Sequence, residues 1–275
     1  MVNAVDIKKV IAIGGSDPSG GAGIQADIKT LEELGVYAYT ALAAVTVQNS
    51  KGVKSYDVLS AKFLRDQIEA ILDDTKVHGV KTGMLGSSEN VMEIAYLVSG
   101  QMIENSIIDP VIKANDGKML VPEASITVLK KRLLPYCFMI TPNINEAEWL
   151  TGINIRNVDD FVGAAKALKE TGVEWVLVKG GHLEGGKAID LLFDGKNEYY
   201  FETDKIPIKN VRGTGCMMAS AICAFLTQGM QVYDAVGKAK TYVANKIKKA
   251  VLLGKGSLQA IHSFNEGELS EDRTD

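Results

Sequence analysis

Cysteine and histidine are both scarce in this chain of 275 residues, which contains three of each. The cysteines, Cys137, Cys216 and Cys223, show no C-x-x-C spacing, so the sequence predicts neither a disulfide framework nor a zinc site. No triad pattern, G-x-S-x-G motif or H-E-x-x-H motif is present. We therefore expect His182 to belong to a loop or a pocket wall rather than to act as a catalyst.

A surplus of positive charge and a long apolar run are also missing. The chain has 30 Lys and Arg against 34 Asp and Glu, a net charge of −4, which argues against a nucleic-acid-binding surface. No uncharged apolar run approaches the roughly 20 residues of a membrane span, and no long apolar core follows the first residues as in a signal peptide. We expect a cytoplasmic protein that binds neither nucleic acid nor membranes.

What is present is a regular alternation of short apolar runs and helix-like amphipathic runs. Strands are expected at 10–13, 37–47, 77–82, 107–111, 138–141, 175–179, 188–193 and 198–201, the last two joined by a turn at Asp194-Gly195. Helices are expected at 22–34, 62–73, 89–99, 126–132, 161–170, 216–227 and 233–251. This pattern predicts an α/β fold with a mostly parallel sheet covered by helices on both faces. We expect one domain, residues 1–262, and a polar tail, residues 263–275.

The first motif is a glycine-rich segment, 13-IGGSDPSGGAGIQADIKTLEELG-35, in which five glycines occur within ten residues after a strand. Glycine allows a ligand to approach the backbone closely, but it also permits tight turns. The segment matches neither the P-loop nor the dinucleotide-binding pattern. From the residues alone, a ligand loop and a purely structural turn remain equally open, and Ser16, Asp17 and Asp27 could serve only the turn and the helix.

The second motif is Thr46-Val47-Gln48-Asn49, at the end of an apolar run. The amide of Gln48 donates and accepts hydrogen bonds at once, which suits a nitrogen heterocycle that carries an amine. Capping of a strand end is the alternative, and the motif alone favours it.

The third motif, 140-ITPNINEAEWLTG-152, places Asn143 and Glu146 at the start of a helix. Glu146 could bind Mg²⁺ while Asn143 reaches a phosphate. An N-cap followed by an acidic residue at the third helical position is an equally good interpretation of the same spacing.

The fourth motif, 177-LVKGGHLEGGKAIDLLF-193, places Lys179 at the end of a strand, before Gly180 and Gly181. The lysine could neutralise phosphate charge, and the two glycines could admit a flat base. A solvated lysine before a turn is the alternative.

The fifth motif is 209-KNVRGTGCMMASAICAFLTQG-229, in which Gly213-Thr214-Gly215 leads directly into an apolar helix. The free N–H groups expected at 214–217, together with the helix dipole, would bind the oxyanions of a phosphoryl group. This signal is the most specific of the five, although a Gly-Thr-Gly helix entry can also be structural.

Taken together, these segments resemble the ribokinase-like superfamily, and within it the hydroxymethylpyrimidine/phosphomethylpyrimidine kinases of thiamine biosynthesis. The matching segments follow the family's order and spacing over nearly the whole chain. They are GGSDPSGGAGIQAD (14–27), VTVQN (45–49), KTGMLGS (81–87), IDPV (108–111), LLPYCFMITPNINEA (133–147), VKGGH (178–182) and GTGC (213–216). The set is specific to the superfamily and less specific to this branch, because pyridoxal kinases share much of it.

The resemblance implies a three-layer αβα sandwich that transfers the γ-phosphate of ATP to the primary alcohol of a pyrimidine. Enzymes of this family typically act first on the hydroxymethyl compound and then on its monophosphate. Mg²⁺ is the implied metal ion, K⁺ is a candidate additional ion, and a homodimer is the implied assembly.

The resemblance also assigns roles to residues. On the acceptor side, Gln48 would bond to the pyrimidine ring and its amino group, and the same pocket would be lined by Gly15, Ala22, Asp27 and Met84. On the nucleotide side would lie Asn143, Lys179, Gly180 and Gly181, with Glu146 for Mg²⁺. The anion hole would comprise Gly213, Thr214 and Gly215, and Cys216 would occupy the position of the superfamily's general base.

Two positions depart from the family's pattern. Asn115 stands where a lysine is common, so a phosphate contact is absent or is supplied by Lys113 or Lys118. Arg212 stands where a histidine commonly precedes GTGC, and its charge could strengthen nucleotide binding.

Cys216 raises a chemical question, because most of the superfamily has an aspartate at this position. A free thiol has a pKa near ~8.5 and is only slightly ionised at neutral pH. The helix N-terminus and Arg212 would lower that value and a triphosphate would raise it, so the sequence leaves the sign open. A weak base is sufficient if phosphoryl transfer is loose and depends mainly on anion stabilisation.

Three alternatives to a pyrimidine kinase remain. A pyridoxal or pyridoxine kinase has the same fold and chemistry, but the amide of Gln48 matches an aminopyrimidine better. A hydroxyethylthiazole kinase shares GTGC but not the segment 14–27. A non-catalytic regulator that binds a vitamin precursor is disfavoured by the intact segment 213–216 and by Asn143 and Glu146.

Overall fold

The computed structural model describes residues 7–100, 103–114, 116–181 and 186–260. A nine-stranded sheet forms its centre, in the order β3-β2-β1-β4-β5-β6-β7-β8-β9. The strands are β1 (Lys9–Ser16), β2 (Tyr37–Asn49), β3 (Gly52–Val58), β4 (Gly79–Thr82), β5 (Asn105–Ile108), β6 (Met139–Ile140), β7 (Trp175–Gly180), β8 (Lys187–Phe193) and β9 (Glu198–Asp204). Strands β2, β1, β4, β5, β6 and β7 run parallel, whereas β3, β8 and β9 are antiparallel to their neighbours.

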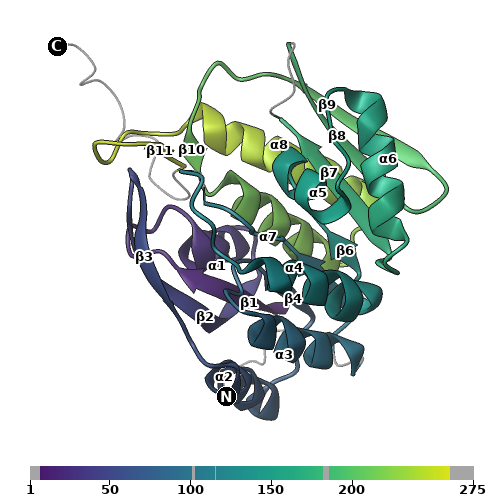
Figure 1. Cartoon of the computed structure of the whole chain (residues 1–275). Coiled ribbons are helices and arrows are strands. Elements are labelled where there is room, and N and C mark those ends of the chain that lie inside the picture. The colour runs from purple at the N-terminus through teal and green to yellow at the C-terminus, as the bar shows by residue number, and fades with distance from the viewer. Residues whose placement is uncertain (1–6, 101–102, 115, 182–185, 261–275) are drawn as a thin grey trace.

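Eight α-helices surround the sheet among the described residues. They are α1 (Gly23–Glu33), α2 (Ala61–Asp74), α3 (Ser88–Ser99), α4 (Glu123–Val128), α5 (Ile144–Thr151), α6 (Val158–Lys169), α7 (Thr214–Thr227) and α8 (Val232–Lys248). Helices α1, α7 and α8 pack on one face of the sheet and α2 to α6 on the other, as Figure 1 shows. The three-layer αβα architecture predicted from the sequence is confirmed.

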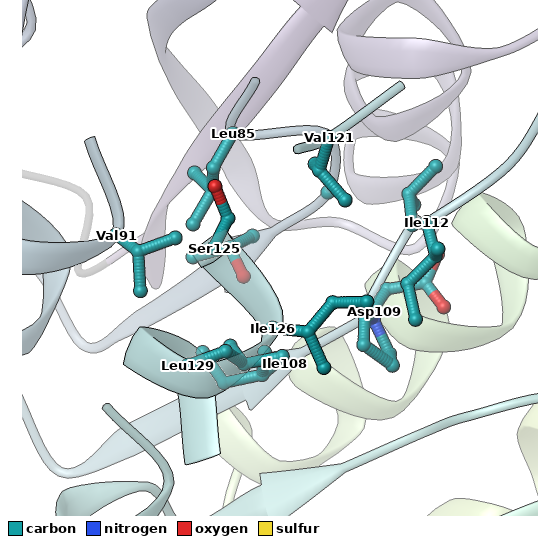
Figure 2. A pocket seen from close by; sticks show the side chains of 13 residues that line it. Leu85, Val91, Ile108, Asp109, Ile112, Val121, Ser125, Ile126 and Leu129 are labelled. Atoms are coloured by element: carbon teal, nitrogen blue, oxygen red, sulfur yellow. The ribbon is translucent and has the colours of Figure 1, made fainter. Parts of the chain in front are cut away.

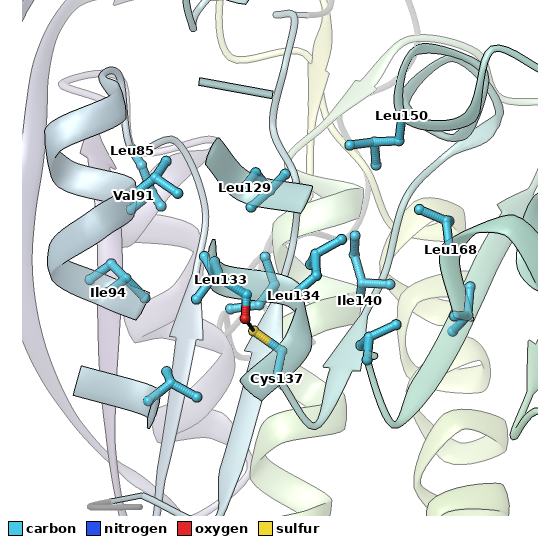
Figure 3. Packing of buried hydrophobic residues seen from close by; sticks show 14 of the residues in the cluster. Leu85, Val91, Ile94, Leu129, Leu133, Leu134, Cys137, Ile140, Leu150 and Leu168 are labelled. Atoms are coloured by element: carbon cyan, nitrogen blue, oxygen red, sulfur yellow. Dashed lines mark hydrogen bonds between the residues drawn. The ribbon is translucent and has the colours of Figure 1, made fainter. Parts of the chain in front are cut away.

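The two cores follow from the period of two in the strands. In β1, Ile11 and Ile13 face the core beneath α2 to α6, and Val10 and Ala12 face the core beneath α1, α7 and α8. Figure 3 shows part of the first core, where side chains of the α3 and α4 region meet those of the central strands. Cys137 lies there as a buried free thiol, and its Sγ donates to the carbonyl of Leu133 at 3.1 Å.

Most expected elements are present, with three differences. Strand β3 and the short parallel pair β10 (Val211–Arg212) and β11 (Leu258–Gln259) were not predicted. The helix expected at 126–132 is α4, continued by a π-helical turn at Leu129–Leu133 and a 3₁₀ turn at Leu134–Tyr136. The tail 263–275 lies outside the described residues, so the domain boundary at 262 stays a prediction. Within the described ranges, no helix is both long and apolar enough to span a lipid bilayer.

Candidate active site

The motif residues converge at the carboxyl ends of the parallel strands, where sheets of this topology bind ligands. Strand β1 leads into the glycine-rich loop, and β5 is followed directly by Asp109. The backbones of Asn143 and Lys179 bridge at the ends of β6 and β7. The N-terminus of α7 reaches the same edge, because a Cβ on Gly215 would lie 3.4 Å from the Lys179 ammonium. Segments from five parts of the chain therefore meet at one place.

Helix α7 presents its first amide groups at this edge. Gly213 is the N-cap, with φ of 76°, and a Cβ there would lie 2.1 Å from the carbonyl oxygen of Gly21. The amide of Met217 already donates to the carbonyl of Gly213 at 2.9 Å. The amides without an intrahelical carbonyl are thus those of Thr214, Gly215 and Cys216, which shortens the predicted set 214–217 by one. These three N–H groups and the helix dipole make an anion site.

A lysine and a carboxylate stand beside the mouth of the helix. The Lys179 ammonium lies 2.9 Å from Asp109 Oδ1, and the Asp109 side chain is buried. Burial alone would lower the pKa of Lys179, but Asp109 and Glu146 reverse this effect and raise it. The side chain is therefore cationic at neutral pH, as an anion site requires.

Asn143 and Glu146 form a capping box at the start of α5. The Asn143 side chain accepts from the Glu146 amide at 2.9 Å, and the Glu146 carboxylate accepts from the Asn143 amide at 2.8 Å. Burial raises the pKa of Glu146 to about 8, with Lys179 opposing the rise and Asp109 adding to it. Both interpretations of this motif thus remain compatible, since a helix cap can also present a carboxylate to the site.

The donors present fit a magnesium ion only if the substrate completes its coordination. Among the described residues, no group of three or more His, Cys, Asp and Glu side chains is close enough to cage an ion. Mg²⁺ at nucleotide sites is usually held by one or two carboxylates together with phosphate oxygens and water. Glu146 can supply one such carboxylate once the ion displaces its proton, because a pKa of about 8 leaves the side chain mostly protonated at neutral pH.

Cys216 is half-buried in the first turn of α7. Burial raises the pKa of its thiol to about 11, Lys81 is the strongest group that opposes the rise, and a hydrogen bond from the Gly23 amide also opposes it. The direction of the pKa shift, which the sequence left open, is therefore upward in the ligand-free protein. At neutral pH the thiol is protonated.

Asp17 organises the glycine-rich loop and ties it to the entry of α7. Its carboxylate accepts from the amides of Ser19, Gly21 and Ala22 at 2.9 to 3.1 Å. It also pairs with the Arg212 guanidinium at 2.9 Å, and Arg212 donates to the Ser19 hydroxyl at 2.9 Å. Arg212 is buried, and its guanidinium is already paired within this loop, so its charge stabilises the loop rather than a bound nucleotide.

The residues expected on the acceptor side lie around the end of β1. A Cβ on Gly15 would lie 3.1 Å from the Met84 sulfur, so the two positions are in contact. Gln48 Oε1 accepts from the Thr46 hydroxyl at 3.1 Å, and the same hydroxyl donates to the carbonyl of Ser16 at 2.9 Å. Ala22 is the N-cap of α1, and its Cα lies 3.4 Å from a Cβ built on Gly213. Ala22 thus contacts the entry of α7 directly, and the substrate contacts of all these positions stay predictions.

Asp27 lies deeper than the resemblance implied. It is buried, both of its oxygens accept from the Lys81 ammonium at 2.8 and 2.9 Å, and the Ser220 hydroxyl donates to it at 2.8 Å. A direct contact of Asp27 with a substrate stays a prediction, because the carboxylate faces Lys81 in this structure.

On the nucleotide side, packing explains one glycine and leaves another open. A Cβ on Gly180 would lie 2.1 Å from the carbonyl oxygen of Ile189 and 2.4 Å from the Phe161 ring, so packing requires glycine there. Gly181 is exposed, and a Cβ there would meet no atom within 4 Å. Gly181 is therefore the one with room for a ligand.

The lysines suggested as substitutes at position 115 have other partners. Lys118 donates to the carbonyls of Val53 and Lys54 in the β2–β3 hairpin. The Lys113 ammonium lies over the Trp149 ring, 4.6 Å from its centroid. Asn115 and His182 lie outside the described residues.

A small cavity of about 30 Å³ lies beside Asp109 (Figure 2). Its walls are mostly apolar, and it has room for about one water molecule but not for a substrate. Within the described part of the chain, the Thr82 hydroxyl that lines it is buried without a hydrogen-bond partner. We therefore do not place the acceptor there.

Two charged residues of the site were not singled out from the sequence. Asp109 was signalled by its place after an apolar run in IDPV, where a charged residue marks a strand end. Lys81 lies inside an apolar strand, and only a partner 54 residues away explains its burial. No local pattern could have identified this second residue.

Comparisons with known proteins agree with this geometry. A profile described as phosphomethylpyrimidine kinase matches residues 17–260. The hydroxymethylpyrimidine/phosphomethylpyrimidine kinase of Bacillus subtilis is 38% identical over 98% of this chain and all of its own length. The thiamine biosynthesis bifunctional protein ThiED of Geobacter sulfurreducens is 42% identical over 90% of this chain, which spans only 50% of that longer protein.

Among solved structures, the ADP complex of Bacillus subtilis pyridoxal kinase has a TM-score of 0.86 and 32% identity, over 94% of this chain and 98% of its own. That likeness agrees with the ribokinase-like fold and with the use of an adenine nucleotide. Because the family profile covers most of the sequence and a curated relative aligns over its full length, this chain belongs to the phosphomethylpyrimidine kinase family.

Proposed function

We propose that this protein transfers the γ-phosphoryl group of ATP to 4-amino-5-hydroxymethyl-2-methylpyrimidine and then to the resulting monophosphate. The observation that carries the proposal is the juxtaposition at the start of α7. Three free amides and the Lys179 ammonium lie beside the Cys216 thiol. The expected acceptor position at Gly15 lies against the start of α1, because a Cβ on Gly23 would lie 2.2 Å from the Gly15 carbonyl oxygen.

The chain's own groups have distinct tasks in this reaction. The amides of 214–216 bind the oxygens of the migrating phosphoryl group and stabilise its charge in the transition state. Lys179 neutralises phosphate charge beside them. The thiolate form of Cys216 accepts the proton of the acceptor alcohol as the new O–P bond forms and the bond between the γ-phosphorus and the leaving ADP oxygen breaks. The products are ADP, the phosphate ester and one proton.

Nucleotide and ions would bind at the ends of β6 and β7, next to the N-terminus of α7. Asn143, Lys179, Gly180 and Gly181 would contact ATP, and Glu146 would hold Mg²⁺. When bound, Mg²⁺ neutralises charge on the phosphates. A requirement for K⁺ and a homodimeric assembly are part of the proposal as expectations from family membership. The first is tested by activity in sodium against potassium buffers and the second by light scattering.

The decisive experiment is product analysis after incubation with MgATP. The aminopyrimidine alcohol, its monophosphate, pyridoxal and pyridoxine are supplied in parallel, and phosphate esters are identified by mass. We expect a monophosphate and then a diphosphate from the pyrimidine. Ligand binding without any ester would contradict the proposal and identify a non-catalytic regulator.

A pyridoxal kinase is the second candidate, favoured by the likeness to the pyridoxal kinase of Bacillus subtilis. Gln48 separates the two, because its amide is proposed to pair with the aminopyrimidine. Gln48→Met should lower kcat/KM for the pyrimidine by at least about tenfold, the effect of an unpaired ring donor and acceptor, and should change pyridoxal turnover less. The reverse order would favour the pyridoxal kinase.

A further inference from the structure

Lys81 is a completely buried lysine to which the proposed reaction gives no task. It lies in the central strand β4, its side chain has no exposed surface, and both oxygens of Asp27 accept from its ammonium. The Ser220 hydroxyl donates to the same carboxylate at 2.8 Å. A buried ion pair usually adds no stability over apolar residues of the same size, so stability alone does not explain this pair.

The pair lies one helical turn behind the Cys216 thiol. Asp27 follows Gly23 by four residues on α1, and Ser220 follows Cys216 by four residues on α7, so each lies on the same helix face as the residue before it. At the upper level, the Gly23 amide lies near the Cys216 thiol and lowers its pKa. At the lower level, Asp27 and Ser220 bond to each other. Lys81 enters from β4 and places its positive charge behind the thiol.

We propose that Lys81, fixed by Asp27 and Ser220, is a positioning residue that stabilises the thiolate form of Cys216. Its catalytic consequence rests on the proposed function, because only the thiolate can accept the proton of the acceptor alcohol. Because the Lys81 side chain is fully shielded from water, its fixed positive charge has a larger effect on a neighbouring negative group than an exposed charge would have. The aspartate common at this position in the superfamily would need no such support, whereas a thiol does.

The other charges around Cys216 make Lys81 the principal favourable group. Burial raises the pKa of the thiol, Asp27 and Asp109 also raise it, and Lys81 lowers it more than the Gly23 amide does. Lys179 faces the thiol from β7 and shares its charge with Asp109 and Glu146. Removal of Lys81 therefore leaves only the Gly23 amide and the shared charge of Lys179, among the groups named here, to oppose the negative groups.

The test measures the reactivity of the thiol and needs no substrate. The ligand-free full-length protein is treated with iodoacetamide between pH 7 and 10, and alkylation is followed on the peptide that contains Cys216. In Lys81→Met the rate should fall about tenfold or more at each pH, the effect of a rise of one pKa unit. In Lys81→Met/Asp27→Asn, which removes both charges, the fall should be smaller, about threefold.

A second buried pair supplies the control. Lys240 lies 2.7 Å from Asp190, and both side chains are about 10% exposed. Lys240→Met breaks a comparable ion pair whose carboxylate bonds to the Gly180 amide and not to Ser220 or Lys81, so the alkylation rate of Cys216 should stay within about twofold of the wild type. Where Lys81→Met does not fold, the double variant carries the test, because it leaves no unpaired buried charge.

Kinetics give an independent readout. The pH at which kcat reaches half its maximum on the acid side should rise in the double variant by the same amount as the thiol pKa. A merely structural role would lower activity without this displacement. Unchanged or faster alkylation of Cys216 in the folded double variant overturns the proposal. Failure to phosphorylate any alcohol, with the expected alkylation rates, would overturn the proposed function and leave the assignment of Lys81 intact.

Discussion

Cys216 is the proton acceptor that we propose, yet burial raises the pKa of its thiol to about 11. Replacement of the thiol should therefore cost less than removal of the anion site. For Cys216→Ala we expect kcat to fall by roughly 10²–10⁴, the range of general bases. The measurement is kcat at saturating MgATP and acceptor. Cys216→Ser is the matched variant: near wild-type rates in both variants would mean that Cys216 only fills a narrow helix start.

The two glycines that flank α7 allow the anion site to be tested at the residue scale. Gly213 and Gly229 both have positive φ, 76° and 89°, but only at Gly213 would a Cβ meet a backbone atom, the Gly21 carbonyl oxygen at 2.1 Å. Gly229→Ala should lower the free energy of unfolding by about 1–2 kcal/mol through backbone strain alone. Gly213→Ala should lower it by about 3 kcal/mol or more. It should also abolish activity.

Urea unfolding of the two glycine variants and their kcat values check this prediction. Equal losses of stability in the two, with activity retained in Gly213→Ala, would show that the glycine-rich loop and α7 are not in the close contact described.

Single residues were predictable where a motif is local and not where a partner is remote. The Gly-Thr-Gly entry and the Asn143–Glu146 spacing are short-range patterns, and the structure has both a helix N-terminus and a capping box there. Lys81 depends on Asp27, 54 residues away, and Arg212 on Asp17, 195 residues away. Burial of such charges follows from tertiary packing, which the sequence does not display locally.

At the element scale, the strands and helices were predicted from strong hydrophobic periodicity. Strand β3 was not predicted because its sequence shows little such periodicity. Its sequence, GVKSYDV, is short, polar and half-exposed. Contacts with another loop hold it: Asp116 accepts from the Val53 amide at 2.7 Å, and the Tyr56 hydroxyl donates to the Met119 carbonyl at 3.3 Å. An element stabilised in this way has no signature within its own residues.

The β8–β9 hairpin, predicted from Asp194-Gly195, offers a pH test. Asp194 accepts from the amides of Lys196 and Asn197, both at 2.6 Å. These bonds, above all that from the Asn197 amide, lower the pKa of Asp194 to about 2 from 3.8. A lowered pKa means that the stabilisation is present above pH 3.8 and is lost as pH falls through about 2. Asp194→Ala should therefore cost about 1 kcal/mol near neutral pH.

The measurement is the free energy of unfolding of wild type and Asp194→Ala from pH 7 downward, where the difference should shrink below pH 4. Asp204→Ala on the same hairpin is the control, because its bond to Lys187 is exposed and such pairs contribute little. A difference that persists unchanged at pH 2 would show that the carboxylate is not the stabilising group.

At the scale of the whole molecule, residues 251–260, which include β11, connect the parts of the site, and we call this segment the brace. Strand β11 pairs with β10 directly before Gly213, and the Gln259 side chain lies 3.0 Å from a Cβ built on Gly21. The amide of Ser257 donates to the Ser50 carbonyl at 2.8 Å, next to the β2–β3 turn. This segment therefore braces the glycine-rich loop, the entry of α7 and the hairpin.

Two truncations separate the brace from the polar tail. A chain that ends at residue 262 should keep wild-type kcat/KM and melting temperature, since the proposed domain ends there. A chain that ends at residue 250 should lose at least about tenfold in kcat/KM through a misplaced site, as small displacements of catalytic groups have large effects. The two are compared by steady-state kinetics and thermal unfolding. Equal activity of both chains would show that residues 251–262 are not needed to hold the site in place.

The ion pair of Asp17 with Arg212 and the bond of Ser220 to Asp27 can form only late in the synthesis of the chain. Their partners are 195 and 193 residues apart. At ribosomal rates, the two aspartates emerge roughly 10–40 s before the groups that complete their shells. The glycine-rich loop and the entry of α7 therefore reach their described arrangement only after the first and last thirds of the polypeptide have met.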